Sequence, residues 1–247
     1  MKKYVYKMII QYDGTNYYGW QYQTNLPTIQ GIIQDKLSVI LNEPKKIQGA
    51  GRTDSGVHAL YMVAHFKYQN LLDINSLLRS LNSLLPPDIR IINIEIAHEK
   101  FNSRFSALWK EYTYYLYKGK ICPPFIYRYV WHYPHNLNID LMKKATDYFL
   151  GLHDFSLFGT AAMKRNDTIR SIDSIDIQSN IDLIILRFKA KSFLRHMVRW
   201  LVGTLVEIGE GKKSLQEIEL LFKEKKYGLV KLKAPPSGLF LTYIAYE

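Results

Sequence analysis

The sequence has little cysteine and no long apolar run. Cys122 is the single cysteine among 247 residues, so no internal disulfide can form, and without a CxxC pair the usual spacing of a structural zinc site is absent. The longest apolar stretch, 197–208, is shorter than the roughly 18 residues of a membrane-spanning helix and contains Arg199. Asp13 follows the N-terminal apolar run, which does not fit an export signal. We therefore expect a cytoplasmic protein that has no metal and does not enter a membrane.

Acidic residues are scarce relative to basic ones. The chain has 22 Asp and Glu against 33 Lys and Arg, which gives a net charge of +11. A solvated basic surface is one explanation, but this excess favours a polyanionic partner. The chain also has 19 tyrosines, and aromatic rings interleaved with basic residues suit unstacked bases better than a duplex backbone. Structured RNA is therefore the leading candidate partner, and duplex DNA is the alternative.

Apolar periodicity predicts two halves with a similar order of elements. The first half is predicted to contain a strand at 4–12, a helix after Thr28 with apolar residues from Ile29 to Leu41, strands near 45–50 and at 61–67, a helix from Ile74 to Leu85 and a strand through Ile92, Ile94 and Ile96. The second half is predicted to contain a strand at 111–118, a helix at 139–150 capped by Asn138, a hairpin of 171–178 and 181–190, a helix at 193–208, a short helix opened by Ser214 and Glu217 and a strand at 239–246.

Each half therefore reads β-α-β-β-α-β, with one extra helix in the second. This is the ferredoxin-like or split βαβ order, which the common RNA-recognition module shares. We expect an α+β fold of two such halves with mixed or antiparallel sheets and a central RNA-binding cleft. The expected domains are residues 1–105 and 106–247.

The most unusual segment is GAGRTDSGVHAL, residues 49–60, in which three glycines surround one acid. No Gly-Lys-Ser/Thr follows, which excludes a P-loop, and Asp54 occupies the place of the third glycine of a dinucleotide-binding motif. Residues 53–56 fit a type I turn with Gly56 at its fourth position, so spacing alone favours a plain hairpin. Arg52 argues against that interpretation, because it adds a guanidinium close to the carboxylate.

Six segments together resemble the tRNA pseudouridine synthase A family. GRTDSGVHA at 51–59 is similar to its signature loop, and five other segments follow the family's order and spacing over nearly the whole chain: YDGTNYYGWQYQ with TIQG, FNSRFSALWKEYTYYLY, GLHDFSLF, FLRHMVRWLVG and APPSGLFLTYIAY. Glu111 and Trp200 depart from the family pattern, and Trp200 leaves the reach of its neighbour Arg199 open.

The resemblance implies an isomerase that converts uridine to pseudouridine at positions 38–40 of the tRNA anticodon stem-loop. It also implies a homodimer that needs no metal or redox cofactor. A non-catalytic protein that binds structured RNA on the same fold is the alternative. The resemblance gives no choice between attack on ribose C1′ and attack on uracil C6.

Three residues carry the implied chemistry. Asp54 is the nucleophile, and a carboxylate that is already ionised needs no separate base to attack. Tyr112 stacks on the target uracil, although strand alternation alone does not separate it from Tyr114 or Tyr115. Arg199 is the active-site arginine, although periodicity alone favours a surface cation on an amphipathic helix.

Other basic residues are expected to hold the RNA. The resemblance gives Arg52 the role of holding the place of the flipped base or gripping a phosphate. We expect further contacts from basic residues along the approach to the site: Arg104, Lys164, Arg165, Arg170 and Arg195. His58 is expected to support the Asp54 loop, and the neighbours His153 and Asp154 are expected to form a structural or RNA-positioning turn rather than a catalytic pair.

Overall fold

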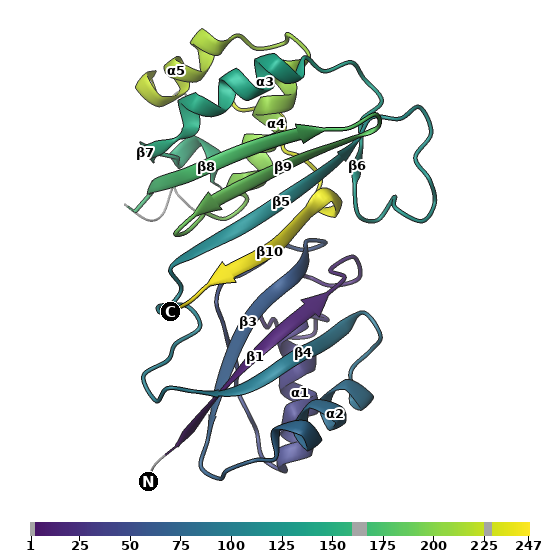
Figure 1. Ribbon diagram of the computed structural model, residues 1–247, viewed down its shortest axis with the longest axis vertical. Coiled ribbons are helices and arrows are strands. Elements are labelled where there is room, and N and C mark those ends of the chain that lie inside the picture. Colours follow the sequence, from purple (N-terminus) through teal and green to yellow (C-terminus); the bar gives the residue numbers. More distant parts are fainter. Residues whose placement is uncertain (1–2, 160–166, 225–228) are drawn as a thin grey trace. The chain divides into compact units, whose positions relative to one another are not determined.

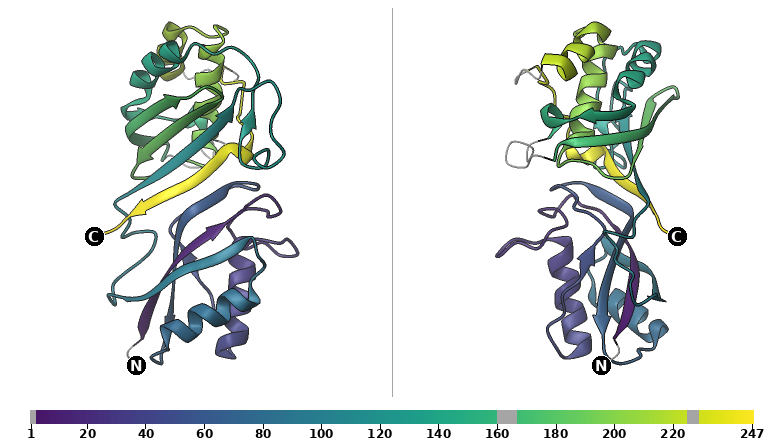
Figure 2. Two further views of the ribbon diagram at one scale, coloured as in Figure 1. Left: turned by 45° about the vertical axis from the view of Figure 1, so that its right-hand side comes forward. Right: turned by 90° about the vertical axis from the view of Figure 1, so that its left-hand side faces the viewer.

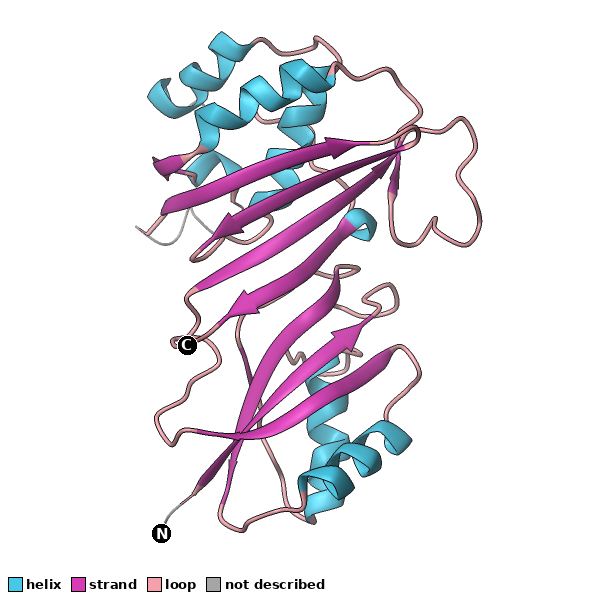
Figure 3. Cartoon of the chain, viewed as in Figure 1, coloured by secondary structure: helices cyan, strands magenta, loops and turns pink. Residues whose placement is uncertain are grey.

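The computed structural model describes residues 3–159, 167–224 and 229–247 (Figure 1). The chain forms two compact units, one of Met1–Leu108 with Phe240–Glu247 and one of Trp109–Leu239. These bounds differ from 1–105 and 106–247 mainly in the last strand, which is grouped with the first unit. Figure 3 shows that both units combine helices with strands, so the α+β class is confirmed.

The first unit has the expected β-α-β-β-α-β order. Its elements are β1 (Tyr4–Tyr12), α1 (Ile29–Leu41), β2 (Gln48–Gly49), β3 (His58–Tyr68), α2 (Ile74–Leu84) and β4 (Ile89–Ala97). Strand β1 pairs antiparallel with both β3 and β4, and β2 pairs antiparallel with β3. This arrangement is the ferredoxin-like one. The last strand, β10 (Leu239–Ala245), runs parallel to the start of β3, with Phe240 opposite His58.

The core of this unit lies between the sheet and its helices. Ile29, Ile33 and Leu37 form the buried face of α1, and Thr28 caps this helix by accepting a hydrogen bond from the Gly31 amide. Figure 2 shows α1 and α2 beside the strands of the unit. Tyr6 of β1 and Phe66 of β3 also belong to this core. Their rings stack with centroids 5.0 Å apart.

Strand β4 differs from the simple alternation of Ile92, Ile94 and Ile96. Its register against β1 shifts between Ile9, which pairs with Asn93, and Ile10, which pairs with Ile91. The extra residue at this bulge is Ile92, which is 48% exposed, whereas Ile91 and Ile94 are buried. The predicted strand is present, but Ile92 does not share the buried position of Ile94.

The second unit is built around an antiparallel sheet. Its strands are β5 (Trp109–Tyr117), β6 (Trp131–His132), β7 (Gly151–Asp154), β8 (Ile169–Ser179) and β9 (Leu183–Ala190), and its helices are α3 (Ile139–Thr146), α4 (Met197–Gly209) and α5 (Leu215–Glu224). The sheet order is β5-β9-β8-β7, and the short β6 pairs in parallel with β5. Single 3₁₀ turns lie at Asp147–Phe149, Ser156–Phe158 and Pro236–Gly238.

Local signals placed the caps and the hairpin of this unit correctly. Asn138 accepts a hydrogen bond from the Leu141 amide at 2.9 Å and so caps α3. Ser214 and Glu217 exchange the two hydrogen bonds of a capping box at the start of α5. The Asn180 amide donates to the Leu183 carbonyl and closes the hairpin between β8 and β9.

Helix α4 and strand β7 differ from the predictions. The helix begins at Met197 rather than at Phe193, because His196 has a φ of 65° in the left-handed region and cannot continue a right-handed helix. Strand β7 was expected as a turn. It pairs with β8 instead, with His153 opposite Arg170.

Helix α4 is buried along nearly its whole length, and the segment 230–234 covers one side of it. Gly203 makes this approach possible, because a Cβ atom there would lie 1.8 Å from the carbonyl oxygen of Leu232. One turn earlier, the Arg199 carbonyl accepts a hydrogen bond from the Ala234 amide at 3.1 Å. The helix and the segment are therefore held together by backbone contacts that a side chain at position 203 would block.

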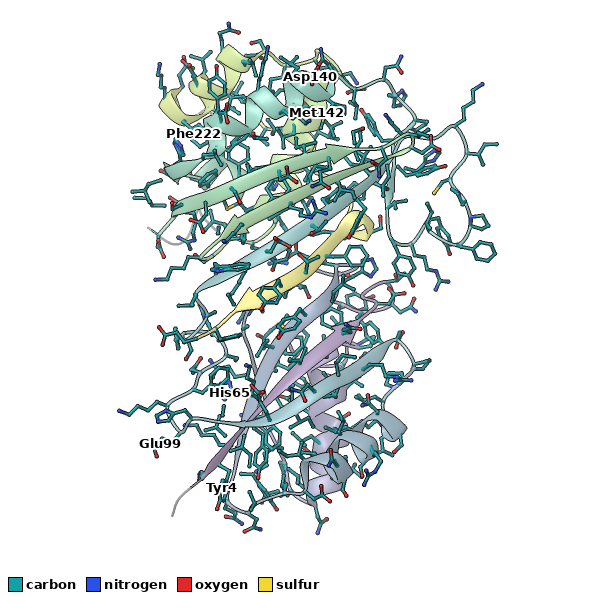
Figure 4. The ribbon with its side chains drawn as sticks, viewed as in Figure 1. Tyr4, His65, Glu99, Asp140, Met142 and Phe222 are labelled. Carbon is teal, nitrogen blue, oxygen red and sulfur yellow. The ribbon has the colours of Figure 1, made fainter. Side chains whose placement is uncertain are left out.

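Gly203→Ala is expected to destabilise the protein by about 1–3 kcal/mol, because the backbone of Leu232 cannot yield as a side chain can. Gly209→Ala in the same helix is the matched control. Its Cβ would meet the Met142 side chain, which is labelled in Figure 4 and can change rotamer. Urea unfolding followed by circular dichroism compares the two variants. Equal midpoints for Gly203→Ala and wild type would show that this close approach is not a constraint.

Candidate active site

The Asp54 loop connects β2 to β3 in the first unit. The Val57 amide donates to the Asp54 carbonyl at 3.2 Å, and Gly56 has a φ of 76°. The turn therefore spans residues 54–57 with a left-handed glycine at its third position, as a type II turn requires. The sequence pattern had placed the turn one residue earlier, at 53–56, with Gly56 fourth. In the observed turn Asp54 is the first residue, and its side chain is half-buried.

The segment that follows β1 fixes this loop on both sides of Asp54. The Trp20 amide donates to the Thr53 carbonyl at 3.1 Å. The Tyr17 carbonyl accepts hydrogen bonds from the Gly56 amide at 3.3 Å and from the Ser55 hydroxyl at 3.1 Å. These bonds leave little freedom to the backbone that carries the carboxylate.

Gly19 allows the two segments to approach each other. It has a φ of 83°, and a Cβ atom there would lie 2.5 Å from the Thr53 carbonyl oxygen and 3.0 Å from the Asp54 carbonyl carbon. Any side chain at position 19 would push the loop away. Sequence reasoning missed this role, because Gly19 and Asp54 are far apart in the chain and no local pattern connects them.

His58, at the start of β3, contacts the segment that follows β1. Its ring is buried, and its Nδ1 lies 3.1 Å from the Gly14 amide nitrogen and 3.0 Å from a carboxylate oxygen of Asp13. The ring stacks on Phe240 of β10 with centroids 4.6 Å apart. His58 thus connects the start of β3 to the segment after β1 and to β10.

In the second unit, the structure separates the tyrosines of β5 that the sequence left equivalent. Tyr114 is fully buried, and its hydroxyl donates to the Pro235 carbonyl at 2.9 Å. Burial raises the pKa of this hydroxyl well above its ordinary value, and the Arg199 guanidinium opposes that shift. Tyr112 is only half-buried, and its ring meets that of Phe193 edge to face at 5.2 Å. Of these two, Tyr112 keeps accessible ring surface.

Arg199 is not the surface cation that helical periodicity favours. Its side chain lies in the buried part of α4 with 9% exposure, and its Nε donates to the Ala234 carbonyl at 2.8 Å. A buried guanidinium needs such partners, because removing the charge from water is costly. The neighbouring Trp200 is half-buried, and the ammonium of Lys233 lies 5.5 Å from the centre of its ring.

The expected RNA-binding residues have different surroundings. Arg52 and Arg104 are exposed in the first unit, and the Arg104 guanidinium lies 5.5 Å from the centre of the Phe105 ring. Arg195 is exposed in the second unit. Arg170 is paired with Asp167 at 2.9 Å, which neutralises part of its charge. Lys164 and Arg165 lie outside the described residues.

His153 and Asp154 do not form a catalytic pair with each other. His153 hydrogen-bonds through Nε2 to the Leu150 carbonyl at 2.7 Å. The Asp154 carboxylate accepts from the Thr168 hydroxyl and from the Ser156 amide. These contacts hold the residues of strand β7 in place.

No group of three or more His, Cys, Asp or Glu side chains in residues 3–159, 167–224 and 229–247 is placed to hold a metal ion. Within the same ranges, the helices are too short or too polar to cross a membrane.

The chain is similar to known proteins over nearly its whole length. A family model described as tRNA pseudouridine synthase matches residues 8–106 and 145–247, ranges that include Asp54 and Arg199 but not Tyr112. The tRNA pseudouridine synthase A 1 of Protochlamydia amoebophila is 43% identical over 98% of this chain and 96% of its own. The tRNA pseudouridine synthase A of Thermodesulfovibrio yellowstonii is also 43% identical, over 97% of this chain and 98% of its own.

Among solved structures, the archaeal box H/ACA sRNP Nop10-Cbf5 complex matches with a TM-score of 0.33 and 13% identity, covering 94% of this chain and 58% of that chain. A similarity this weak adds nothing to the assignment, which rests on the family model and the curated relatives. On those grounds, the chain belongs to the tRNA pseudouridine synthase family, whose members are isomerases.

Proposed function

We propose that this protein converts uridine to pseudouridine at positions 38–40 of the tRNA anticodon stem-loop, with Asp54 as the nucleophile. The observation that carries the proposal is the position of Asp54 at the start of a turn whose backbone is hydrogen-bonded to residues 17 and 20. A fixed carboxylate in a half-buried position suits attack on one defined atom of a bound nucleotide.

The reaction exchanges one bond for another within the same nucleotide. The bond between uracil N1 and ribose C1′ breaks, the uracil turns, and a new bond forms between C5 and C1′. C5 loses a proton and N1 gains one, so uridine and pseudouridine have the same composition and no electrons are transferred to another molecule. Attack of Asp54 on either C1′ or C6 keeps the uracil bound between the two steps, and both routes remain compatible with the geometry of the turn.

Tyr112 and Arg199 complete the proposed set of catalytic residues. The accessible part of the Tyr112 ring would stack on the uracil, an interaction worth roughly 1–3 kcal/mol per base. Its hydroxyl would assist removal of the C5 proton. The hydrogen bond from Arg199 Nε to Ala234 fixes the plane of the guanidinium, so its terminal nitrogens are held in a defined direction for an anionic group.

Exposed basic residues would supply the affinity for tRNA. A uridine in a stem-loop must leave its stack before a carboxylate can reach it, at a cost of a few kcal/mol. Arg52, Arg104 and Arg195 are exposed and can neutralise phosphates, and the net charge of +11 agrees with this role. Arg170 would contribute less, because Asp167 already pairs with it. Lys164 and Arg165 are kept in the proposal on the sequence pattern alone.

Asp54→Asn is expected to lower pseudouridine formation by about a thousand-fold or more, because the amide has nearly the same size but is not a nucleophile. Asp35→Asn, an equivalent change at an exposed position of α1, should leave activity unchanged. Carbodiimide treatment of the tRNA followed by primer extension gives a stop at each pseudouridine. A stop that survives Asp54→Asn contradicts the catalytic role. Tight tRNA binding by the wild type without any stop would favour an RNA-binding protein that lacks activity.

Tyr112→Phe should keep tRNA affinity within about two-fold and lower the single-turnover rate by about 100-fold, because the ring remains and the hydroxyl does not. Tyr112→Ala should also weaken binding. Tyr115→Phe is the control, since Tyr115 points to the opposite face of β5. Single-turnover kinetics at several enzyme concentrations separates rate from affinity. Full activity of Tyr112→Phe would remove the hydroxyl from the mechanism and leave only stacking.

We also propose that the protein acts as a homodimer in the cytoplasm, as the family resemblance implies. Multi-angle light scattering of the purified protein at micromolar concentration should give a mass near twice the 29.0 kDa of one chain. A mass of one chain under these conditions would refute the dimer.

A further inference from the structure

Two tyrosines in the loop between β1 and α1 have large exposed rings. Tyr18 is 52% exposed and Tyr22 is 54% exposed. An exposed tyrosine is often only a solvated side chain. The surroundings of these two residues differ, however. Tyr18 lies in the segment that contacts the Asp54 loop, whereas Tyr22 lies against α1.

Tyr18 directly precedes Gly19, whose backbone lies against Thr53 and Asp54. The segment from Tyr17 to Trp20 runs along the segment from Thr53 to Gly56, with hydrogen bonds at both ends of the paired stretch. Between these bonds, the backbone at Gly19 comes within contact distance of Thr53 and Asp54. The residue that precedes this contact is Tyr18.

Two hydrogen bonds hold the backbone of Tyr18. Its amide donates to the Pro27 carbonyl at 2.9 Å, and its carbonyl accepts from the Gln23 side-chain amide at 3.0 Å. The ring of Tyr18 therefore projects from a fixed backbone. Binding a base against such a ring costs less conformational entropy than binding against a ring on a mobile loop.

Tyr22 lies against α1 instead. The position of a Cβ on Gly31 is 3.2 Å from the Tyr22 ring, and the Tyr22 amide donates to the Gln30 side chain at 2.8 Å. The shallow hollow beside it is also lined by Asp35, whose negative charge repels a phosphate backbone. Tyr22 thus provides a comparison residue of equal type and exposure in the same loop.

We propose that Tyr18 is a positioning residue whose ring stacks on the RNA base next to the target uridine. This inference rests on the proposed function. A uridine that leaves the stack exposes the faces of its neighbours, and an exposed aromatic ring one residue from the contact between Gly19 and Asp54 replaces the lost stacking. Tyr18 would in this way hold the RNA in the register that presents the target to Asp54.

The test compares Tyr18→Ala, Tyr18→Phe and Tyr22→Ala. Fluorescence anisotropy with a labelled anticodon stem-loop RNA gives the Kd, and single-turnover assays with unmodified tRNA give the maximal rate. Tyr18→Ala should raise the Kd by about ten-fold through the loss of one stacked base and change the maximal rate by less than about two-fold. Tyr18→Phe and Tyr22→Ala should bind within about two-fold of wild type, because the first retains the ring and the second lies outside the proposed contact.

Thermal unfolding checks that Tyr18→Ala keeps the wild-type midpoint, since its backbone hydrogen bonds do not need the ring. Wild-type affinity in Tyr18→Ala, or an equal loss in Tyr22→Ala, overturns the inference while leaving the proposed function intact. Absence of pseudouridine with the wild-type protein overturns the proposed function instead. The Kd values would still decide whether Tyr18 contacts RNA.

Discussion

The backbone contact between residues 17–20 and residues 53–56 is the constraint on which the first unit's candidate site depends. It needs a residue without a side chain at position 19, because Thr53 and Asp54 occupy the space that a Cβ would take. The Trp20 amide donates to the Thr53 carbonyl, and the Gly56 amide donates to the Tyr17 carbonyl. These two hydrogen bonds fix the Asp54 loop at both ends. The ferredoxin-like order brings these segments together, since β1 and β3 are neighbours in the sheet and the two loops extend from adjacent strand ends. The position of Asp54 is thus a property of the whole unit.

The second unit contains a buried charge, and its hydrogen bond also depends on a close approach between two backbone segments. Arg199 lies in a helix that is otherwise almost entirely apolar, and it is tolerated because the Ala234 carbonyl accepts a hydrogen bond from its guanidinium. Gly203 lets the segment 230–234 come close enough to provide that carbonyl. The same segment leads to Pro235, whose carbonyl satisfies the buried hydroxyl of Tyr114. One short stretch of chain therefore accepts hydrogen bonds from two buried polar groups.

Features set by neighbouring residues were predictable from the sequence, and features set by distant contacts were not. The caps at Asn138 and Ser214 follow from side chains within one turn of the helix, and both are present. The left-handed His196, which delays the start of α4, has no local signature because it is not glycine. The burial of Arg199 was missed because periodicity assumes that the polar side of a helix meets water.

The candidate site itself became recognisable through the motif match rather than through propensity. Turn statistics described Gly56 correctly as a turn residue but placed the turn one position early. Strand alternation puts Tyr112 and Tyr114 on the same face, and contacts with distant residues such as Pro235 and Trp131 bury Tyr114. The roles of Asp54, Tyr112 and Arg199 in catalysis still rest on the family resemblance and on the proposals above.

The parallel pairing of β10 with β3 makes the first unit discontinuous along the chain. Phe240, on which His58 stacks, is synthesised after all of the residues 109–239. During translation, therefore, the first unit cannot assemble its full set of contacts when its first 108 residues leave the ribosome. Phe240 is therefore added last, and a nascent chain that already contains the Asp54 turn still lacks the ring on which His58 stacks.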